Sequence, residues 1–192
     1  MSGNLLIIGA GIYGLVAKEI AESMGCFEKI AFADDGAKEA PDGTPVIGTT
    51  EDLVPLSNEY ANAVVAIGNP TVRQKLLNKI REETLMRIAI LVSPRAYVSP
   101  SAQIGKGCII EPMAVVHTGC VLGEGCLICA GAVINHASLC GDCVQADCGA
   151  VVAGNTVVPG GIKIAGGTVY QNQKPHGPVP FDGQECSLED GM

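Results

Sequence analysis

The chain has 192 residues, is 47% hydrophobic and carries a formal net charge of −8. This length allows one or two small domains, and no apolar run is long enough to span a bilayer. The negative charge argues against nucleic-acid binding, which needs a basic surface. Residues 1–8 lack the basic start and long apolar core of a signal peptide. We therefore expect a cytoplasmic protein without membrane or nucleic-acid partners.

The chain starts with a buried strand over residues 5–8 and a glycine-rich turn. Gly9, Gly11 and Gly14 give the pattern GxGxxG, and the apolar spacing of residues 15–24 predicts a helix. A strand, this pattern and a helix in succession are typical of a phosphate-binding turn. Glycines let backbone N–H groups approach an anion, and the helix start favours negative charge.

A second strand is predicted over residues 29–33, and it ends in Asp34 and Asp35. An acidic residue at this place commonly binds a ribose, although the alternative is a structural turn with solvated aspartates. Residues 40–48 are rich in proline and glycine and predict a connection. Residues 50–53 could start a short helix.

A third strand is predicted over residues 63–67, and a helix to Glu83 follows. Asn69 suits the N-cap of this helix and Pro70 its first position. Arg73 lies in the first turn, where its charge opposes the helix dipole. The sequence therefore favours an anionic ligand near Arg73, with a surface salt bridge as the alternative.

Residues 88–92 predict a last strand. Three or four parallel strands then form a small Rossmann-like α/β domain over residues 1–93. This length is too short for two Rossmann halves, which argues against a nicotinamide-dependent dehydrogenase.

From Val98 onward the sequence repeats with a period of six. An uncharged, mostly aliphatic residue recurs up to Ile164, and Gly or Asn often occupies the slot three residues later. This period predicts a left-handed parallel β-helix of hexapeptide repeats over residues 94–170. Three hexads make one triangular coil, so residues 18 apart should stack. Residues 171–192 predict an irregular tail.

The cysteines do not predict a disulfide framework or a metal site. Cys108, Cys120 and Cys126 occupy small or apolar slots of the repeat, where cysteine acts as a small hydrophobe. The CxxC motif of Cys140 and Cys143 supplies only two of the four ligands of a structural zinc site. We therefore expect a reduced protein with no bound metal.

The motifs GAGIYGLV, AFADDG, VVAIGNPTVRQKLLNKI and SPSAQIG, followed by hexapeptides, resemble the sugar O/N-acetyltransferase family. This family includes the sialic acid acetyltransferases and the bacillosamine-pathway N-acetyltransferase, and the resemblance covers about residues 4–170. It implies a homotrimer, a nucleotide-linked amino sugar held by the N-terminal domain, and acetyl-CoA in the groove between neighbouring prisms.

The resemblance also implies which residues bind the sugar substrate. They match the family's glycine-rich loop, its aspartate pair and its IGN-x-x-x-R motif: Gly11, Tyr13, Gly14, Asp34, Asp35, Gly68, Asn69 and Arg73. Tyr13 replaces a histidine that is usual in this loop.

The family's catalytic histidine matches His136, as a general base for direct acetyl transfer to an amine or hydroxyl. The residues expected at the acetyl-CoA site are Ala153, Gly154, Asn155 and Gly166. The repeat independently puts His136 on a corner and Gly154 on the same corner one coil later. The alternative is an exposed corner histidine with no task.

Ala137 replaces the glutamate that orients the histidine in the family. Asp142, Asp147 or a backbone carbonyl would then have to orient His136. His117 should lie about one coil below in the adjacent slot, where we favour a surface role.

Two other classes of protein stay open at this point. One is a non-catalytic nucleotide-sugar-binding protein with hexapeptide repeats. The other is a γ-type carbonic anhydrase-like metalloprotein, which needs three histidines at a zinc ion, whereas the chain has three histidines in total and one of them lies in the tail.

Overall fold

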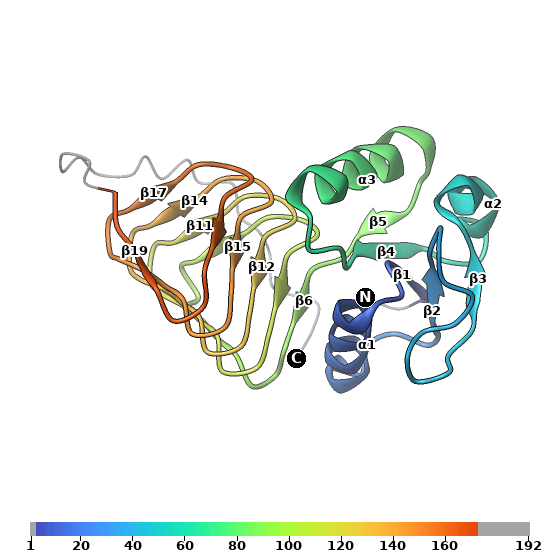
Figure 1. Cartoon of the computed structure of the whole chain (residues 1–192), viewed down its shortest axis with the longest axis horizontal. Coiled ribbons are helices and arrows are strands. Elements are labelled where there is room, and N and C mark those ends of the chain that lie inside the picture. The colour runs from blue at the N-terminus through green and yellow to red at the C-terminus, as the bar shows by residue number, and fades with distance from the viewer. Residues whose placement is uncertain (1–2, 173–192) are drawn as a thin grey trace.

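The computed structural model describes residues 3–172, and they form two domains side by side (Figure 1). An α/β domain comes first in the chain and a triangular β-helix second. Most of the expected tail, residues 173–192, lies outside the described residues. Among residues 3–172, no helix has the length and apolar character needed to cross a membrane.

The N-terminal domain is built on a parallel sheet with the strand order β3-β2-β1-β4-β5. Its strands are β1 (Leu5–Ile8), β2 (Ile30–Ala33), β3 (Val46–Gly48), β4 (Asn62–Val65) and β5 (Arg87–Ile88). Its helices are α1 (Ile12–Met24), the 3₁₀ turn Thr50–Asp52, α2 (Leu53–Leu56) and α3 (Pro70–Glu83). Residues of α1 pack in one apolar cluster, and residues of α2 and α3 pack in another. This layering confirms the Rossmann-like prediction.

The sequence predicted both long helices of this domain. Gly25 ends α1 with a φ of 64°, which glycine adopts at little steric cost. The Asn69 side chain accepts a hydrogen bond from the backbone N–H of Val72, and Pro70 is the first residue of α3. The short edge strand β3 was not predicted, because it lies within the Pro/Gly-rich connection.

The β-helix consists of two-residue strands in three parallel sheets. The β6 sheet holds β6 (Leu91–Val92), β9 (Ile109–Ile110), β12 (Leu127–Ile128), β15 (Gln145–Ala146) and β18 (Lys163–Ile164). The β7 sheet holds β7 (Tyr97–Val98), β10 (Val115–Val116), β13 (Val133–Ile134), β16 (Val151–Val152) and β19 (Val169–Tyr170). The β8 sheet holds β8 (Gln103–Ile104), β11 (Val121–Leu122), β14 (Leu139–Cys140) and β17 (Val157–Val158).

Paired residues in each of these sheets are 18 apart, as in the register of Val115 with Val133 and of Val133 with Val151. The second residue of most strands is buried in one continuous core inside the prism. This register confirms the hexapeptide prediction.

The single strand expected over residues 88–92 is two strands that belong to different domains. Ala89 still donates its N–H to Ala63 of the α/β sheet, whereas Leu91 donates to Cys108 of the β-helix. The β-helix therefore begins a few residues before the expected boundary at residue 93. A continuous apolar run conceals this change of partner in the sequence.

The N-terminal domain packs on the β6 sheet. The outward side chains of Leu91, Ile109 and Leu127 are fully buried in a cluster that includes Ala17 and Ile20 of α1. Figure 1 shows α1 beside β6. Burying these side chains stabilises the contact by about 1.5–3 kcal/mol each.

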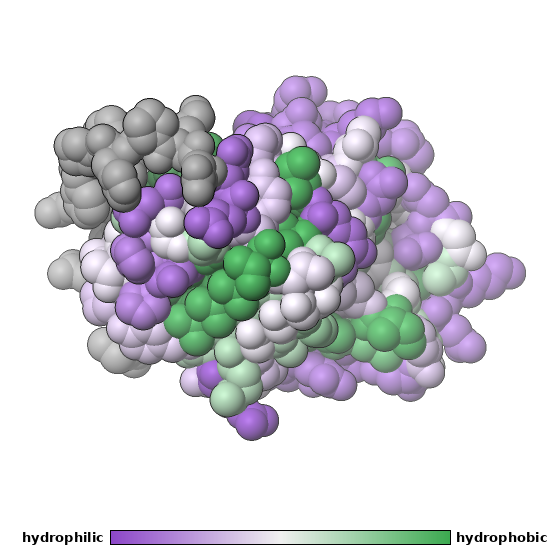
Figure 2. All heavy atoms as spheres, turned by 60° about the vertical axis from the view of Figure 1, so that its left-hand side comes forward, coloured by the Kyte–Doolittle hydropathy of each residue, from purple (hydrophilic) through white to green (hydrophobic). Residues whose placement is uncertain are grey.

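The β7 and β8 sheets carry outward aliphatic rows that the N-terminal domain does not cover. Val115, Val133 and Val151 are half-buried along the β7 sheet, and Val121 and Leu139 along the β8 sheet. Figure 2 shows a hydrophobic stripe across the surface at the side of the molecule where the β-helix lies.

Candidate functional site

The three glycines of the first loop have different structural tasks. Gly9 has a φ of 107°, and a Cβ there would lie 2.9 Å from the Ala66 carbonyl oxygen. A Cβ on Gly14 would overlap the Gly9 carbonyl, so Gly14 allows α1 to pack closely on β1. A Cβ on Gly11 would meet no atom of the described residues within 4 Å. The backbone at Gly11 is therefore open to a ligand at the start of α1.

Asp34 closes the base of this loop. Its carboxylate accepts hydrogen bonds from the backbone N–H groups of Ala10 (2.9 Å), Gly36 (2.8 Å) and Ala37 (2.8 Å). Burial alone would raise the pKa of Asp34, but these three donors outweigh it and hold the pKa below its ordinary value. An ionised Asp34 thus fixes the loop after β1 to the loop after β2.

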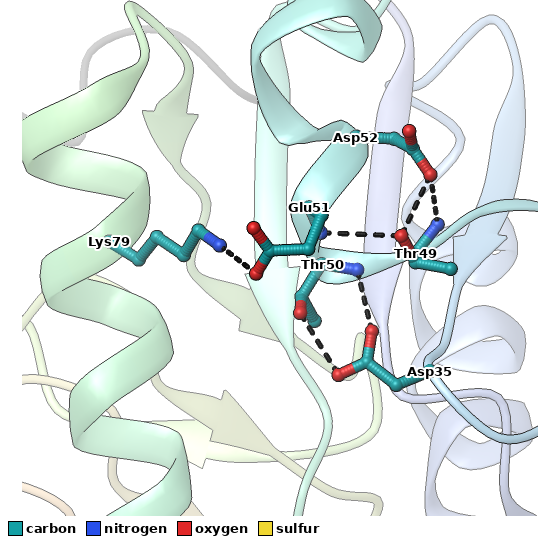
Figure 3. Close-up of polar contacts among 6 residues, drawn as sticks. All are labelled: Asp35, Thr49, Thr50, Glu51, Asp52 and Lys79. Atoms are coloured by element: carbon teal, nitrogen blue, oxygen red, sulfur yellow. Dashed lines mark hydrogen bonds and ion pairs between the residues drawn. The ribbon is translucent and has the colours of Figure 1, made fainter.

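Asp35 points away from its neighbour, toward the turn before α2. Its two carboxylate oxygens accept from the backbone N–H (2.7 Å) and the hydroxyl (2.9 Å) of Thr50, as Figure 3 shows. The same turn carries a capping box between Thr49 and Asp52, and Lys79 of α3 pairs with Glu51 at 2.6 Å. The two aspartates therefore do not act as one pair in this structure.

A crevice site is expected where the strand order reverses between β1 and β4. Gly68 and Asn69 follow β4, and a Cβ on Gly68 would lie 3.9 Å from the side-chain oxygen of Gln145. Gln145 belongs to the β-helix, so the carboxyl end of the α/β sheet lies against the prism.

Tyr13 brings a buried hydroxyl to the same junction. Among residues 3–172, neither its hydroxyl nor the Gln145 side-chain oxygen has a hydrogen-bond partner. Burial raises the pKa of Tyr13 well above its usual value, and nearby Cys129 and Glu111 of the β-helix raise it further.

Arg73 does not face an open anion site, contrary to the expectation from its place in α3. It is fully buried, and its guanidinium donates to the carbonyls of Gly125 (2.7 Å), Cys143 (2.7 Å) and Ile67 (2.5 Å). Two of these carbonyls are in turns of the β-helix. The structure thus gives Arg73 a structural role between the domains, which explains why a cation is tolerated in the first helical turn.

His136 is exposed on the edge where the chain passes from the β7 sheet to the β8 sheet. Its Nδ1 lies 2.9 Å from the Asn135 side-chain oxygen, and this oxygen also accepts from the His136 backbone N–H at 2.8 Å. The orienting group is therefore Asn135. Asp142 instead accepts from the Glu124 N–H, and Asp147 from the Gln145 amide.

Gly154 leaves the space that the His136 ring occupies. A Cβ on Gly154 would lie 2.6 Å from Cε1 and 2.8 Å from Nε2 of His136. The Asn155 side-chain nitrogen lies 3.4 Å from the same Nε2. These contacts confirm the prediction that Gly154 lies one coil above His136, beside the ring. Ala153 is the first residue of this corner, and its carbonyl accepts from the Ser138 hydroxyl.

Gly166 lies on another edge of the prism. It follows β18 of the β6 sheet, so it is on the edge between the β6 and β7 sheets. Within one chain it therefore does not join His136, Gly154 and Asn155.

The His136 edge is also opposite the N-terminal domain. The β7 and β8 sheets meet at this edge, so the β6 sheet, on which the domain packs, is the third face of the triangle. The loop after β1 and His136 are thus on different sides of one prism.

His117 is the aromatic neighbour of His136. Their ring centroids are 6.5 Å apart in an edge arrangement, and Tyr97 is equally far from His117 on the other side. In residues 3–172, no three His, Cys, Asp or Glu side chains gather as ligands for a metal ion.

Comparisons with known proteins define the class of this chain. The sequence model of the PglD N-terminal domain matches residues 4–80, and that of the bacterial transferase hexapeptide (six repeats) matches residues 101–136. No curated protein sequence matches the chain. An α/β domain of the PglD type followed by transferase hexapeptides is thus the class to which the structure belongs.

Solved structures narrow this class. The acetyltransferase domain of PglB from Neisseria gonorrhoeae FA1090 is 32% identical, with a TM-score of 0.79 over 90% of this chain and 93% of that one. The same domain in complex with acetyl coenzyme A is 31% identical, with a TM-score of 0.77 over 85% and 88% of the two chains. The chain belongs to this family of sugar acetyltransferases.

A more distant solved structure shares the fold and contains both CoA and a nucleotide-linked sugar. A mutant of perosamine N-acetyltransferase from Caulobacter crescentus, in complex with CoA and GDP-perosamine, is 26% identical. Its TM-score is 0.67 over 87% of this chain and 90% of that one.

Proposed function

We propose that this protein transfers the acetyl group of acetyl-CoA to an amino or hydroxyl group of a nucleotide-linked sugar, with His136 as the general base. The observation that supports this role is the environment of the imidazole. One ring nitrogen is held by Asn135, and the other faces the space left by Gly154. An exposed corner histidine without a task would need neither feature.

The nucleotide part of the sugar substrate is assigned to the crevice of the N-terminal domain. Gly11 offers open backbone at the start of α1, Gly14 and Asp34 hold this loop in place, and Gly68 and Asn69 form the opposite wall. Tyr13 closes the crevice on the prism side. Arg73 and Asp35 support the surrounding structure through their own hydrogen bonds.

Acetyl-CoA is assigned to the His136 edge, along Ala153, Gly154 and Asn155. In the reaction, Nε2 of His136 takes a proton from the acceptor as its nitrogen or oxygen attacks the thioester carbonyl. The bond from carbon to sulfur then breaks, the proton held by His136 passes to the sulfur, and CoA leaves as the thiol. Histidine suits this task because its ordinary pKa lies near neutrality.

Direct transfer without a covalent acyl-enzyme is supported by the Cys120 thiol near this edge, which is poorly suited to act as a nucleophile. The Cys120 sulfur lies 3.0 Å from the Asn135 carbonyl, inside the prism. Burial raises the pKa of the Cys120 thiol, which disfavours the reactive thiolate.

A homotrimer would complete the site. Since His136 and the nucleotide crevice are on opposite sides of one prism, a second chain has to bring its crevice, and with it Gly166, to the His136 edge. Uncovered aliphatic rows flank this edge on the β7 and β8 sheets, and they suit a contact between prisms.

The test is release of CoA thiol from acetyl-CoA with amino sugars linked to UDP, GDP, dTDP or CMP. We expect turnover with one nucleotide class and a rise in melting temperature with the same class. His136→Ala should lower kcat by about 10²- to 10⁴-fold and leave the fold intact. Bound nucleotide sugar with no thiol release from the wild type would instead support the non-catalytic alternative.

A further inference from the structure

The side chain of Asn135 determines which nitrogen of His136 carries the proton. The backbone N–H of His136 can only donate, and it lies 2.8 Å from Asn135 Oδ1. The atom at this place must therefore be the amide oxygen and not the amide nitrogen. This backbone contact fixes the orientation of the amide independently of the imidazole.

The same oxygen lies 2.9 Å from Nδ1 of His136. An amide oxygen has two lone pairs and accepts from both donors, so Nδ1 has to present an N–H to it. The neutral ring then has its lone pair on Nε2. The contact with Asn155 agrees, because its Nδ2 is a donor and lies 3.4 Å from Nε2.

We propose that Asn135 is the positioning residue that holds His136 in the Nδ1–H tautomer, with Nε2 as the basic nitrogen directed at Gly154 and Asn155. Asn155 donates weakly to Nε2 in the free protein and releases it when the acceptor binds. The catalytic consequence rests on the proposed acetyl transfer, whereas the tautomer itself does not.

This arrangement explains how the site works with an alanine at position 137. Ala137 has no group that could reach the ring, and its φ of 52° turns the chain at this corner. Asn135 thus gives the imidazole a neutral partner in place of the charged glutamate that the family resemblance implies at position 137. Of the described groups near the ring, His117 is titratable, and Asn135, Gly154 and Asn155 carry no charge.

The tautomer is tested by ¹⁵N NMR of the ligand-free protein labelled at histidine, above the pH at which the imidazole titrates. His136→Gln assigns the His136 signals by their loss. We expect a protonated Nδ1 and an unprotonated Nε2 in the wild type, and growth of the Nε2–H tautomer in Asn135→Ala. Asn155→Gly keeps the backbone conformation and should leave the Nδ1–H tautomer in place.

Kinetics test the positioning role. Asn135→Ala should lower kcat by about tenfold or more with little change in KM, because only the reacting proton transfer loses its orientation. Asn135→Asp should restore kcat and move the acid limb of the pH profile to higher pH, since a carboxylate favours the imidazolium. Asn58→Ala, an exposed asparagine of the other domain, is the matched control.

The two hypotheses fail in different ways. A wild-type His136 protonated on Nε2, or an unchanged tautomer in Asn135→Ala, overturns the role of Asn135 whatever the activity. Absence of thiol release from the wild type with every sugar, together with the expected NMR signals, would reject the proposed function and leave the tautomer assignment standing.

Discussion

At the scale of single residues, the corners of the β-helix impose one backbone conformation on different side chains. The third corner residue has a positive φ at seven glycines and at Met113, Ala137, Cys143 and Asn155. Asparagine tolerates this left-handed region, whereas a residue such as alanine is strained there by about 1–2 kcal/mol. Ala137 therefore stores strain directly beside His136.

Ala137→Gly should increase the free energy of unfolding by about 0.5–1 kcal/mol, because the left-handed strain is removed. Gly161→Ala is the matched control with the opposite sign. Gly161 has a φ of 73°, and a Cβ there would meet no atom of residues 3–172 within 4 Å, so the expected cost is conformational. Urea unfolding at one protein concentration measures both variants. Equal stability of the two variants and the wild type would show that these corners relax without strain.

At the scale of elements, α3 is joined to the β-helix by two arginines in very different surroundings. Arg73 is fully buried and donates to three carbonyls, two of them in β-helix turns. Arg81 forms an ion pair with Glu124 of the β-helix, and both side chains are partly exposed. Both contacts link α3 to the β-helix, but the Arg73 contact is shielded from water and the Arg81 ion pair is not.

Arg73→Met should destabilise the protein by about 2–4 kcal/mol, because buried carbonyl groups lose their donors. Arg81→Met should change stability by less than about 1 kcal/mol, as for other exposed ion pairs. Thermal unfolding with separate probes for the two domains measures the effect. An equal loss in both variants would contradict the structural role of the buried guanidinium.

The sequence predicted these elements where one local pattern determines them. The six-residue period fixes the register of the β-helix, and Asn69 with Pro70 fixes the start of α3. The sequence could not show that residues 88–92 divide between two sheets, because one apolar run serves both. It also could not show that Arg73 turns inward, since its three acceptors come from distant turns.

In the candidate site, too, the sequence predicted the positions that a local pattern determines and missed a contact that depends on side-chain rotation. His136 and Gly154 follow from the repeat, which places residues 18 apart on one corner. Asn135 was missed because its role depends on the rotation of two neighbouring side chains, and no sequence period encodes that rotation. Its only signal was an amide directly before the histidine.

At the scale of the whole molecule, two faces of the prism expose aliphatic rows. Val133→Lys places a charge in the middle of the row on the β7 sheet, between Val115 and Val151. We expect this variant to sediment as a monomer and the wild type as a trimer, because an unpaired charge would be buried in the contact. Ile47→Lys, at an exposed position of β3, should leave the assembly unchanged. A trimeric Val133→Lys would place the contact elsewhere.

The proposed division of the site between the nucleotide crevice of one chain and the His136 edge of another predicts that two inactive variants restore each other's activity. His136→Ala lacks the proposed general base. Gly11→Glu should fold normally, since a Cβ there meets no described atom within 4 Å, but the added carboxylate should repel the phosphate of the proposed nucleotide-linked sugar. If each active site takes the crevice of one chain and the His136 edge of another, mixed trimers contain some complete sites. Unfolding and refolding the two variants together should then recover activity that neither shows alone.

The control for this experiment is a chain that carries both substitutions. Refolded with the wild type, this doubly substituted chain supplies neither an intact crevice nor an intact His136 edge. Each of the two single variants, in contrast, supplies one of these two parts. We expect recovery to rise with the fraction of mixed trimers, measured by thiol release at fixed total protein. Activity that stays absent, while mass spectrometry shows mixed trimers, would mean that one chain holds the whole site. The crevice and the His136 edge would then have to come together within one chain, which their positions on opposite sides of the prism oppose.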